Sequence, residues 1–296
     1  MVSITTATYA WFTLTNSTVV HNMTVEVSTG TVLRASTVFS TQMNDYKGKI
    51  ENPDIDAQMK TTFEPDLTLA SLKLLPVSSG DGAKMYTQAQ NTVDGAPAIP
   101  AQRGCYMEYT LWFMSDKDTN VYLNGSDSPG VDLANADGTK VYSDAKNVGS
   151  QVNVEKAVRL SFEAYHTATG AVSGDKTDYK VLEKPAMIYE PNKDKTGVTL
   201  TGCALADYKK ISGTTVTTQN TFVNLGTNLG VDKDGTAESP FLFSLKAEVP
   251  TRVILRMWVE GEDPQCLNDS TINIERAKVI TRLRFCGADD KGNYME

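Results

Sequence analysis

Short segments rich in β-branched and aromatic residues recur along this chain, and clusters of turn-forming residues separate them. Residues 158–163, VRLSFE, alternate apolar and polar side chains with the two-residue period of a β-strand. The segments with strand character are residues 105–114, 157–166, 241–249, 252–260 and 279–285. The pattern predicts an all-β fold, an antiparallel β-sandwich in which each sheet has one face buried and one face in water.

The segments between the predicted strands are long and rich in turn residues. Residues 124–137 and 170–178 are polar loops, and residues 190–240 have room for short strands of their own. Pro250 and Thr251 separate two strand segments, which therefore form a hairpin or a corner. In the best helix candidate, residues 52–60, an asparagine cap precedes a proline at the first helical position. We thus expect long loop insertions and little helix.

Composition argues against several classes of function. The 296 residues carry a formal net charge of −8, which disfavours nucleic acid and anionic membranes as partners. No apolar run approaches the roughly 18 residues of a membrane-spanning helix. The two histidines are His21 and His166, and the sequence contains no HExxH, GxSxG, GxxxxGK or GxGxxG motif. We therefore expect no enzymatic activity, no metal site and no cofactor.

The four cysteines, Cys105, Cys203, Cys266 and Cys286, are widely spaced and form no CxxC pair. Their even number suits two disulfides, for which three connectivities exist. One of these joins Cys105 to Cys286 and Cys203 to Cys266, since the first pair marks the start and the end of two strand segments, as in antiparallel neighbours. The alternative is four unpaired thiols in a reducing compartment.

Two acidic clusters are weak candidates for a cation site. Asp232, Asp234 and Glu238 resemble a fragment of a calcium loop, but the other ligands and the flanking helices of such a loop are missing, which favours a plain turn. Glu260 begins a second acidic cluster that runs into Cys266. For this cluster a disulfide-pinned turn is favoured over a binding site.

Residues 3–28 form a nearly uncharged run rich in Thr and Val, in which Tyr9, Trp11 and Phe12 lie close together. This composition favours extended structure and is too hydrophobic to remain in water. The run must therefore join a sheet, either in its own domain or in a neighbouring molecule. We divide the chain accordingly into an N-terminal strand segment, residues 1–28, and a β-sandwich domain with inserted loops, residues 29–296.

The N-terminus lacks a complete secretion signal, because residues 1–10 contain no Lys or Arg and only a short apolar stretch. Residues 4–10 are compatible with the end of such a signal, followed by the mature protein. We therefore expect a secreted, extracellular protein in nearly mature form.

Two segments resemble secreted surface proteins of Gram-positive bacteria, the TasA and camelysin group and its clostridial relatives. The segment TYAWFT, residues 8–13, resembles the signal-peptide junction of these proteins, and WVEGEDPQC, residues 258–266, followed by VITRLRF, residues 279–285, resembles a C-terminal part. The resemblance implies a jelly-roll-like β-sandwich that assembles head to tail into cell-surface fibres of a biofilm matrix. Camelysin is classed as a metalloprotease, but no residues of this chain support that activity.

In such fibres the N-terminal strand of one subunit completes a sheet of the next. The resemblance thus implies that residues 9–27 are a donor strand and that the chain's partner is a second copy of itself, with no membrane contact once a signal has been removed. The side chains that it assigns to the donor strand are Tyr9, Trp11, Phe12, Leu14, Val19 and Val25. The alternative is a monomeric surface adhesin or carbohydrate-binding module that uses exposed Tyr and Trp around residues 106–124.

Overall fold

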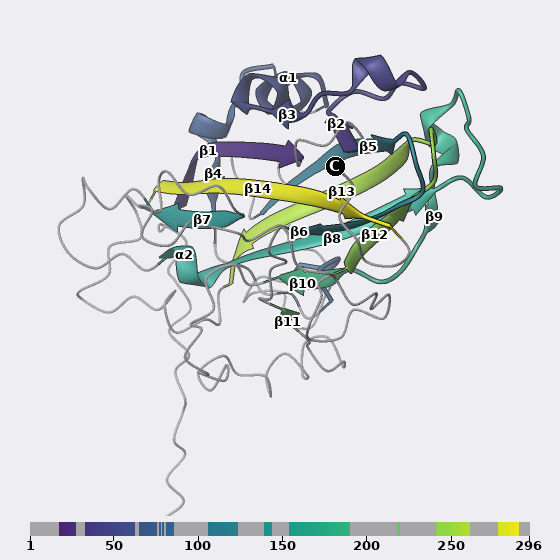
Figure 1. Ribbon diagram of the computed structural model, residues 1–296. Helices are drawn as coiled ribbons and strands as arrows, with labels where there is room; N and C mark the ends of the chain where they lie inside the picture. The colour runs from purple at the N-terminus through teal and green to yellow at the C-terminus, as the bar shows by residue number, and fades with distance from the viewer. Residues whose placement is uncertain are drawn as a thin grey trace, which may run out of the picture.

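The computed structural model shows two β-sheets packed face to face, which confirms the predicted all-β sandwich (Figure 1). The residues that it describes are 18–27, 33–62, 65–75, 77, 79, 81–85, 106–123, 139–143, 154–189, 218–219, 241–260 and 278–289.

The first sheet has the strand order β12-β6-β14-β1-β3, with β4 beside β1 and β7 beside β14. Its strands are β1 (Thr18–Val27), β3 (Lys49–Ile50), β4 (Lys73–Leu74), β6 (Thr119–Leu123), β7 (Lys140–Ser143), β12 (Phe241–Leu245) and β14 (Lys278–Ala288). All described pairs of this sheet are antiparallel except β1 with β14, which run parallel from Val19 and Lys278 to Val27 and Phe285.

The second sheet has the order β11-β10-β8-β13-β5-β2, with β9 beside β8. Its strands are β2 (Leu33–Ser36), β5 (Met107–Ser115), β8 (Val158–His166), β9 (Val181–Leu182), β10 (Met187–Tyr189), β11 (Thr218–Gln219) and β13 (Thr251–Val259). The long strands β5, β13 and β8 form its centre and pair antiparallel along most of their length.

The predicted helix is present as α1 (Asn52–Thr62), which lies beside β1 and β3 (Figure 1). Its first residue has a second role, because the Asn52 side-chain oxygen accepts a hydrogen bond from the Met23 backbone N–H at 2.8 Å. A second helix, α2 (Val154–Ala157), has four residues and leads directly into β8. Among the described residues, helix is therefore a minor element, as expected.

The strands on either side of Pro250 form a corner and not a hairpin. β12 belongs to the first sheet and β13 to the second, so the chain crosses between the layers at residues 246–250. Glu248 has a positive φ of 58° at this crossing, and its N–H donates to the Ser115 carbonyl at 2.7 Å. The backbone bond holds the corner against the end of β5.

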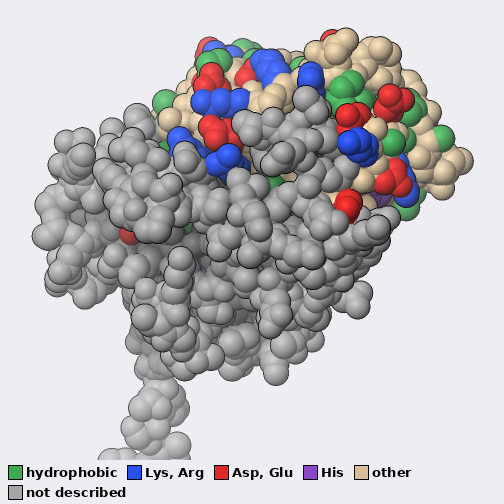
Figure 2. All heavy atoms as spheres, viewed as in Figure 1, with side chains coloured by type: hydrophobic (Ala, Val, Ile, Leu, Met, Phe, Trp, Pro, Cys, Tyr) green, Lys and Arg blue, Asp and Glu red, His purple; other side chains and the backbone are tan. Residues whose placement is uncertain are grey.

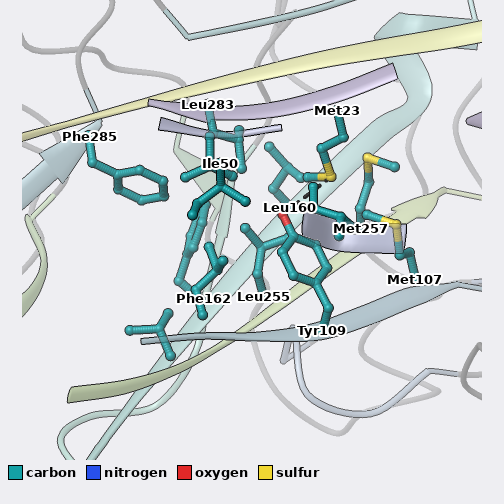
Figure 3. Close-up of a cluster of buried hydrophobic side chains, with 14 of the residues drawn as sticks. Met23, Ile50, Met107, Tyr109, Leu160, Phe162, Leu255, Met257, Leu283 and Phe285 are labelled. Atoms are coloured by element: carbon teal, nitrogen blue, oxygen red, sulfur yellow. Dashed lines mark hydrogen bonds between the residues drawn. The ribbon is translucent and has the colours of Figure 1, made fainter. Parts of the chain in front are cut away.

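The core between the sheets is aliphatic, aromatic and rich in methionine (Figure 3). Leu283 and Phe285 of the first sheet face Phe162 and Leu255 of the second, and the Phe162 and Phe285 ring centroids lie 5.8 Å apart. Tyr109 points across the layer toward Met23, and its hydroxyl donates to the Met23 sulfur at 3.2 Å. β1 is thus tied to the opposite sheet as well as to its own.

The expectation of one wet face per sheet is wrong for the second sheet. In β8, the side chains of Arg159, Ser161 and Glu163 face away from the core but are also buried. Part of the cover on this face is aromatic, because Tyr179 packs its ring edge-on against Trp112 of β5 at 5.2 Å. Loops therefore cover the outer face of this sheet. The alternation of polar and apolar residues in β8 shows which side chains face the core, but it does not show which are exposed to solvent.

Candidate assembly site

The structure places residues 18–27 of the expected donor strand in the chain's own first sheet. Val25 is fully buried in the core, with Leu283 and Ile50 as its register partners. The Val19 backbone pairs with Lys278 and Lys73. The other residues assigned to the donor strand, Tyr9, Trp11, Phe12 and Leu14, lie outside the described residues.

The side of β1 that faces away from β14 is covered along its length. β4 pairs with Thr18 and Val19 at the start of β1, and β3 pairs with residues 25 and 26 near its end. Between them the Asn52 side chain takes the Met23 N–H in place of a strand. A further strand would therefore have to displace three elements to reach β1.

One side of the sandwich is closed by backbone. Lys47 exchanges two hydrogen bonds with Ala35 of β2, at 2.7 and 2.9 Å, and so extends the second sheet. The Gly48 carbonyl accepts from the Val27 N–H at 3.0 Å, and β3 follows directly in the first sheet. Residues 47–50 thus bond to both sheets and leave little edge open on this side.

The opposite side of the sandwich is closed by charged side chains. β12 is the last strand of the first sheet, and no described strand pairs with its outer side. There the Ser244 N–H donates to both carboxylate oxygens of Glu183, at 3.0 and 3.1 Å. Lys184 Nζ donates to the Phe241 carbonyl at 2.6 Å and lies 4.1 Å from the centre of the Phe241 ring. We call the side chains of Glu183 and Lys184 the β12 clamp.

The second sheet holds the β12 clamp in position. Glu183 follows β9 directly, and its N–H donates to the Ala164 carbonyl of β8 at 2.9 Å. His166 Nε2 lies 3.0 Å from the Glu183 carboxylate, and His166 Nδ1 lies 3.4 Å from the Thr251 hydroxyl. His166, which belongs to no sequence motif, therefore orients one half of the clamp. The sequence did not predict the clamp, because residues 183 and 184 are far from β12 in the chain and no sequence motif links them to it.

A second polar cluster lies on the outer face of the second sheet. Arg256 Nε donates to Glu108 at 2.6 Å and Arg256 Nη1 to Glu163 at 2.5 Å, and the Tyr165 hydroxyl donates to Glu163 at 3.1 Å. Burial lowers the pKa of Arg256, but the two carboxylates outweigh burial and raise it. The guanidinium and Glu163 are both nearly inaccessible to solvent. The cluster is therefore a structural ion-pair network and not an open site.

The acidic candidates in the described part of the chain behave as structural residues. Glu260 is fully buried and accepts from the Trp258 indole N–H at 3.1 Å. Asp81 accepts backbone N–H bonds from Ala83 and Lys84, at 2.9 and 2.7 Å, and so forms a plain turn. Among the described residues, no group of three or more His, Cys, Asp and Glu side chains is placed to hold a metal. Asp232, Asp234 and Glu238 lie outside those residues.

Of the four cysteines, Cys286 alone falls within the described ranges. It is buried in β14, and its sulfur lies 3.8 Å from the Tyr122 carbonyl oxygen. The strand segments that start at Cys105 and end near Cys286 were expected to be antiparallel neighbours. This expectation is wrong, because the corresponding strands, β5 and β14, belong to different sheets. Cys105, Cys203 and Cys266 lie outside the described residues.

The aromatic platform expected around residues 106–124 is not exposed. The aromatic side chains there are buried, namely Tyr106, Tyr109, Trp112, Phe113 and Tyr122. In the described part of the chain, the large exposed hydrophobic side chains are aliphatic: Val38, Val172, Val181 and Leu182. The described surface in Figure 2 shows acidic and basic side chains interspersed.

Comparison with protein-family models, with curated proteins and with solved structures found no match. Within the described ranges, no helix is long and apolar enough to cross a membrane.

Proposed function

We propose that this chain is a structural subunit of a secreted cell-surface fibre or pilus and that it assembles head to tail. The donated segment comprises the residues before Thr18, with Tyr9, Trp11, Phe12 and Leu14 as its anchors. The subunit acts without catalysis, metal or cofactor, and its partner is a second copy of itself.

The observation that carries the proposal is the uncharged, strand-favouring sequence that precedes β1. Residues 3–17 contain no charged side chain, and they continue directly into β1. β1 itself belongs to the chain's own first sheet, where it pairs with β14 and β4. The donor is therefore shorter than residues 9–27, since Val19 and Val25 belong to β1.

Strand addition suits such a segment physically. Entry into an open sheet edge satisfies its backbone donors and acceptors, while alternate side chains fill pockets of the acceptor. Full burial of a large apolar side chain contributes about 1.5–3 kcal/mol, so the three aromatic anchors together contribute several kcal/mol. A head-to-tail contact of this kind does not close on itself and therefore produces filaments.

The rival function, a monomeric adhesin or carbohydrate-binding module, has lost its main support. It required exposed aromatic side chains around residues 106–124, and Trp112 and Tyr122 are buried. A chain that stays monomeric at high concentration would nevertheless favour it.

The test is deletion of residues 1–17, followed by size exclusion and negative-stain microscopy. We expect filaments from the full chain and a folded monomer from the shortened chain, because β1 is left intact. The double variant Trp11→Ser/Phe12→Ser should behave like the deletion. Its control is Val38→Ser, which changes a side chain that is 70% exposed, and this variant should still form filaments. A full chain that remains monomeric, or a deletion variant that still forms filaments, would overturn the proposal.

A further inference from the structure

The outer side of β12 is an edge whose backbone groups are bonded to side chains. The Ser244 N–H and the Phe241 carbonyl point away from β6 and bind the charged ends of Glu183 and Lys184. These are a donor and an acceptor that a neighbouring strand would otherwise use. The β12 clamp therefore imitates a strand partner and protects the edge from other chains.

We infer that β12 is the acceptor strand for the N-terminal segment of a second copy and that the β12 clamp keeps this edge closed until the segment displaces it. The inference rests on the proposed function, since it names the acceptor for the same donated segment.

Displacement of the clamp exposes surface that suits an aromatic donor. Lys184 Nζ lies over the Phe241 ring, which also packs against Tyr122 at a centroid distance of 5.9 Å. When Lys184 leaves, this ring becomes available to an aromatic side chain such as Trp11. The Glu183 side chain is 20% exposed, so it already borders water and regains hydration when it is released.

Several other described sheet edges are poorer acceptors. The outer side of β2 is bonded to Lys47, and β3 and β4 themselves cover β1. β9 and β11 have two residues each, too few to align a donor strand. Compared with these edges, β12 has five residues of strand, with a register shift between Phe241 and Phe243, and two of its backbone groups are bonded to side chains.

Phe12 and Leu14 of the same chain are too few residues away from β1 to reach β12. In the register of the first sheet, Val19 of β1 is paired with Lys278 of β14. Phe241 of β12 is paired with Tyr122 of β6, which is in turn paired with Cys286 of β14. Eight residues along a strand and three strand spacings across a sheet separate Val19 from Phe241 by about 30 Å. Phe12 precedes Val19 by seven residues and so extends at most about 25 Å from it. A contact between copies therefore brings Phe12 to β12, whereas a fold-back onto the chain's own β12 does not.

Cross-linking of the full chain tests the acceptor directly. Phe12 is replaced by p-benzoyl-phenylalanine, light and ¹⁵N-labelled chains are mixed before assembly, and the photoproducts are mapped by mass spectrometry. We expect cross-links between light and heavy chains that end in residues 241–245 or at Glu183 and Lys184. Filaments whose cross-links join two chains but end elsewhere, or that yield no cross-links, would overturn the acceptor assignment and leave the proposed function standing. Cross-links that stay within one chain would overturn the proposed function as well. An absence of filaments would remove both.

The closing role of the clamp is tested by the double variant Glu183→Ala/Lys184→Ala. We expect it to assemble at a several-fold lower concentration than the unaltered chain, because the edge is already open. The matched control is Lys49→Ala/Glu51→Ala, which removes an acid–base pair at 2.9 Å on the opposite side of the sandwich and should leave assembly unchanged. If thermal unfolding shows that the clamp variant is folded, and it still assembles only at the concentration that the unaltered chain requires, the clamp does not have this role.

Discussion

At the residue scale, a few side chains hold positions that tolerate little change. Arg256 is buried between two carboxylates, and Gly82 has a φ of 70° and lies against Ser161 of β8. Asp54 joins α1 to the segment that bonds both sheets. Each of these residues has a physical role that predicts the direction and the size of its response to mutation.

Replacement of Arg256 by alanine should destabilise the fold by about 3–5 kcal/mol, because it leaves the Glu163 carboxylate buried without its partner. Urea unfolding followed by tryptophan fluorescence measures the change. The variant Glu163→Gln/Arg256→Met removes both charges and should recover much of the loss. If Arg256→Ala unfolds at the same midpoint as the unaltered chain, the network contributes nothing.

Gly82→Ala should cost about 1–3 kcal/mol, because a residue with a Cβ is strained at this positive φ. The new methyl group would also lie 2.9 Å from the Ser161 Cβ, where the Ser161 hydroxyl now donates to the Gly82 carbonyl at 2.6 Å. Gly174→Ala is the matched control, since a Cβ there meets nothing within 4 Å. Thermal unfolding should separate the two variants, and equal midpoints would contradict the account.

Asp54→Asn should weaken the fold at neutral pH by less than about 1 kcal/mol and make it less sensitive to acid. Burial opposes ionisation of Asp54, but hydrogen bonds from Lys47 and from the Glu51 N–H outweigh it and lower its pKa. A lowered pKa stabilises the fold above the carboxyl's ordinary pKa, and this contribution is lost as the pH falls through the folded value. Unfolding midpoints between pH 7 and pH 2 test this, with Asp66→Asn as an exposed control. A gap that widens in acid would contradict the sign.

At the element scale, β1 separates a structural part of the N-terminal region from the proposed donor. Val20, Met23 and Val25 are fully buried, and β1 pairs with β14 over eight register positions. The interior of the first sheet therefore depends on this strand.

Deletion of residues 1–27 should therefore abolish folding, whereas deletion of residues 1–17 should not. Removal of β1 exposes the edge of β14 and leaves the Tyr109 hydroxyl without the Met23 sulfur. Circular dichroism and hydrogen exchange of the two shortened chains measure the difference. A folded chain without β1 would mean that the whole of residues 1–27 is free to be donated.

The elements that could be predicted from the sequence are those with a long local signal. Alternation over residues 157–166 identified β8, and the Asn52–Pro53 pair identified α1. β3, β4 and β9 have two residues each, too few for a periodic pattern, and their pairing depends on distant partners. The β12 clamp joins residues about sixty positions apart in the chain through side chains, so no spacing in the sequence indicates it. A hairpin and a corner at Pro250 would have the same local sequence. Only the assignment of β12 and β13 to different sheets shows that the chain forms a corner.

At the scale of the whole molecule, the sandwich is closed by two different means. Residues 47–50 close one side with backbone hydrogen bonds to both sheets, and the β12 clamp closes the other with two side chains. The first closure is part of the fold, and the second is the one that we propose a donated strand replaces. This asymmetry gives the proposed subunit one donor and one acceptor at different places, as a head-to-tail fibre requires.

The most direct test of this account is a cryo-electron microscopy map of the assembled full chain. The account predicts filaments in which an added strand lies along β12 of each subunit and continues into Thr18 of the preceding subunit. Filaments in which that strand returns to its own subunit, or a chain that forms no filaments at all, would contradict it.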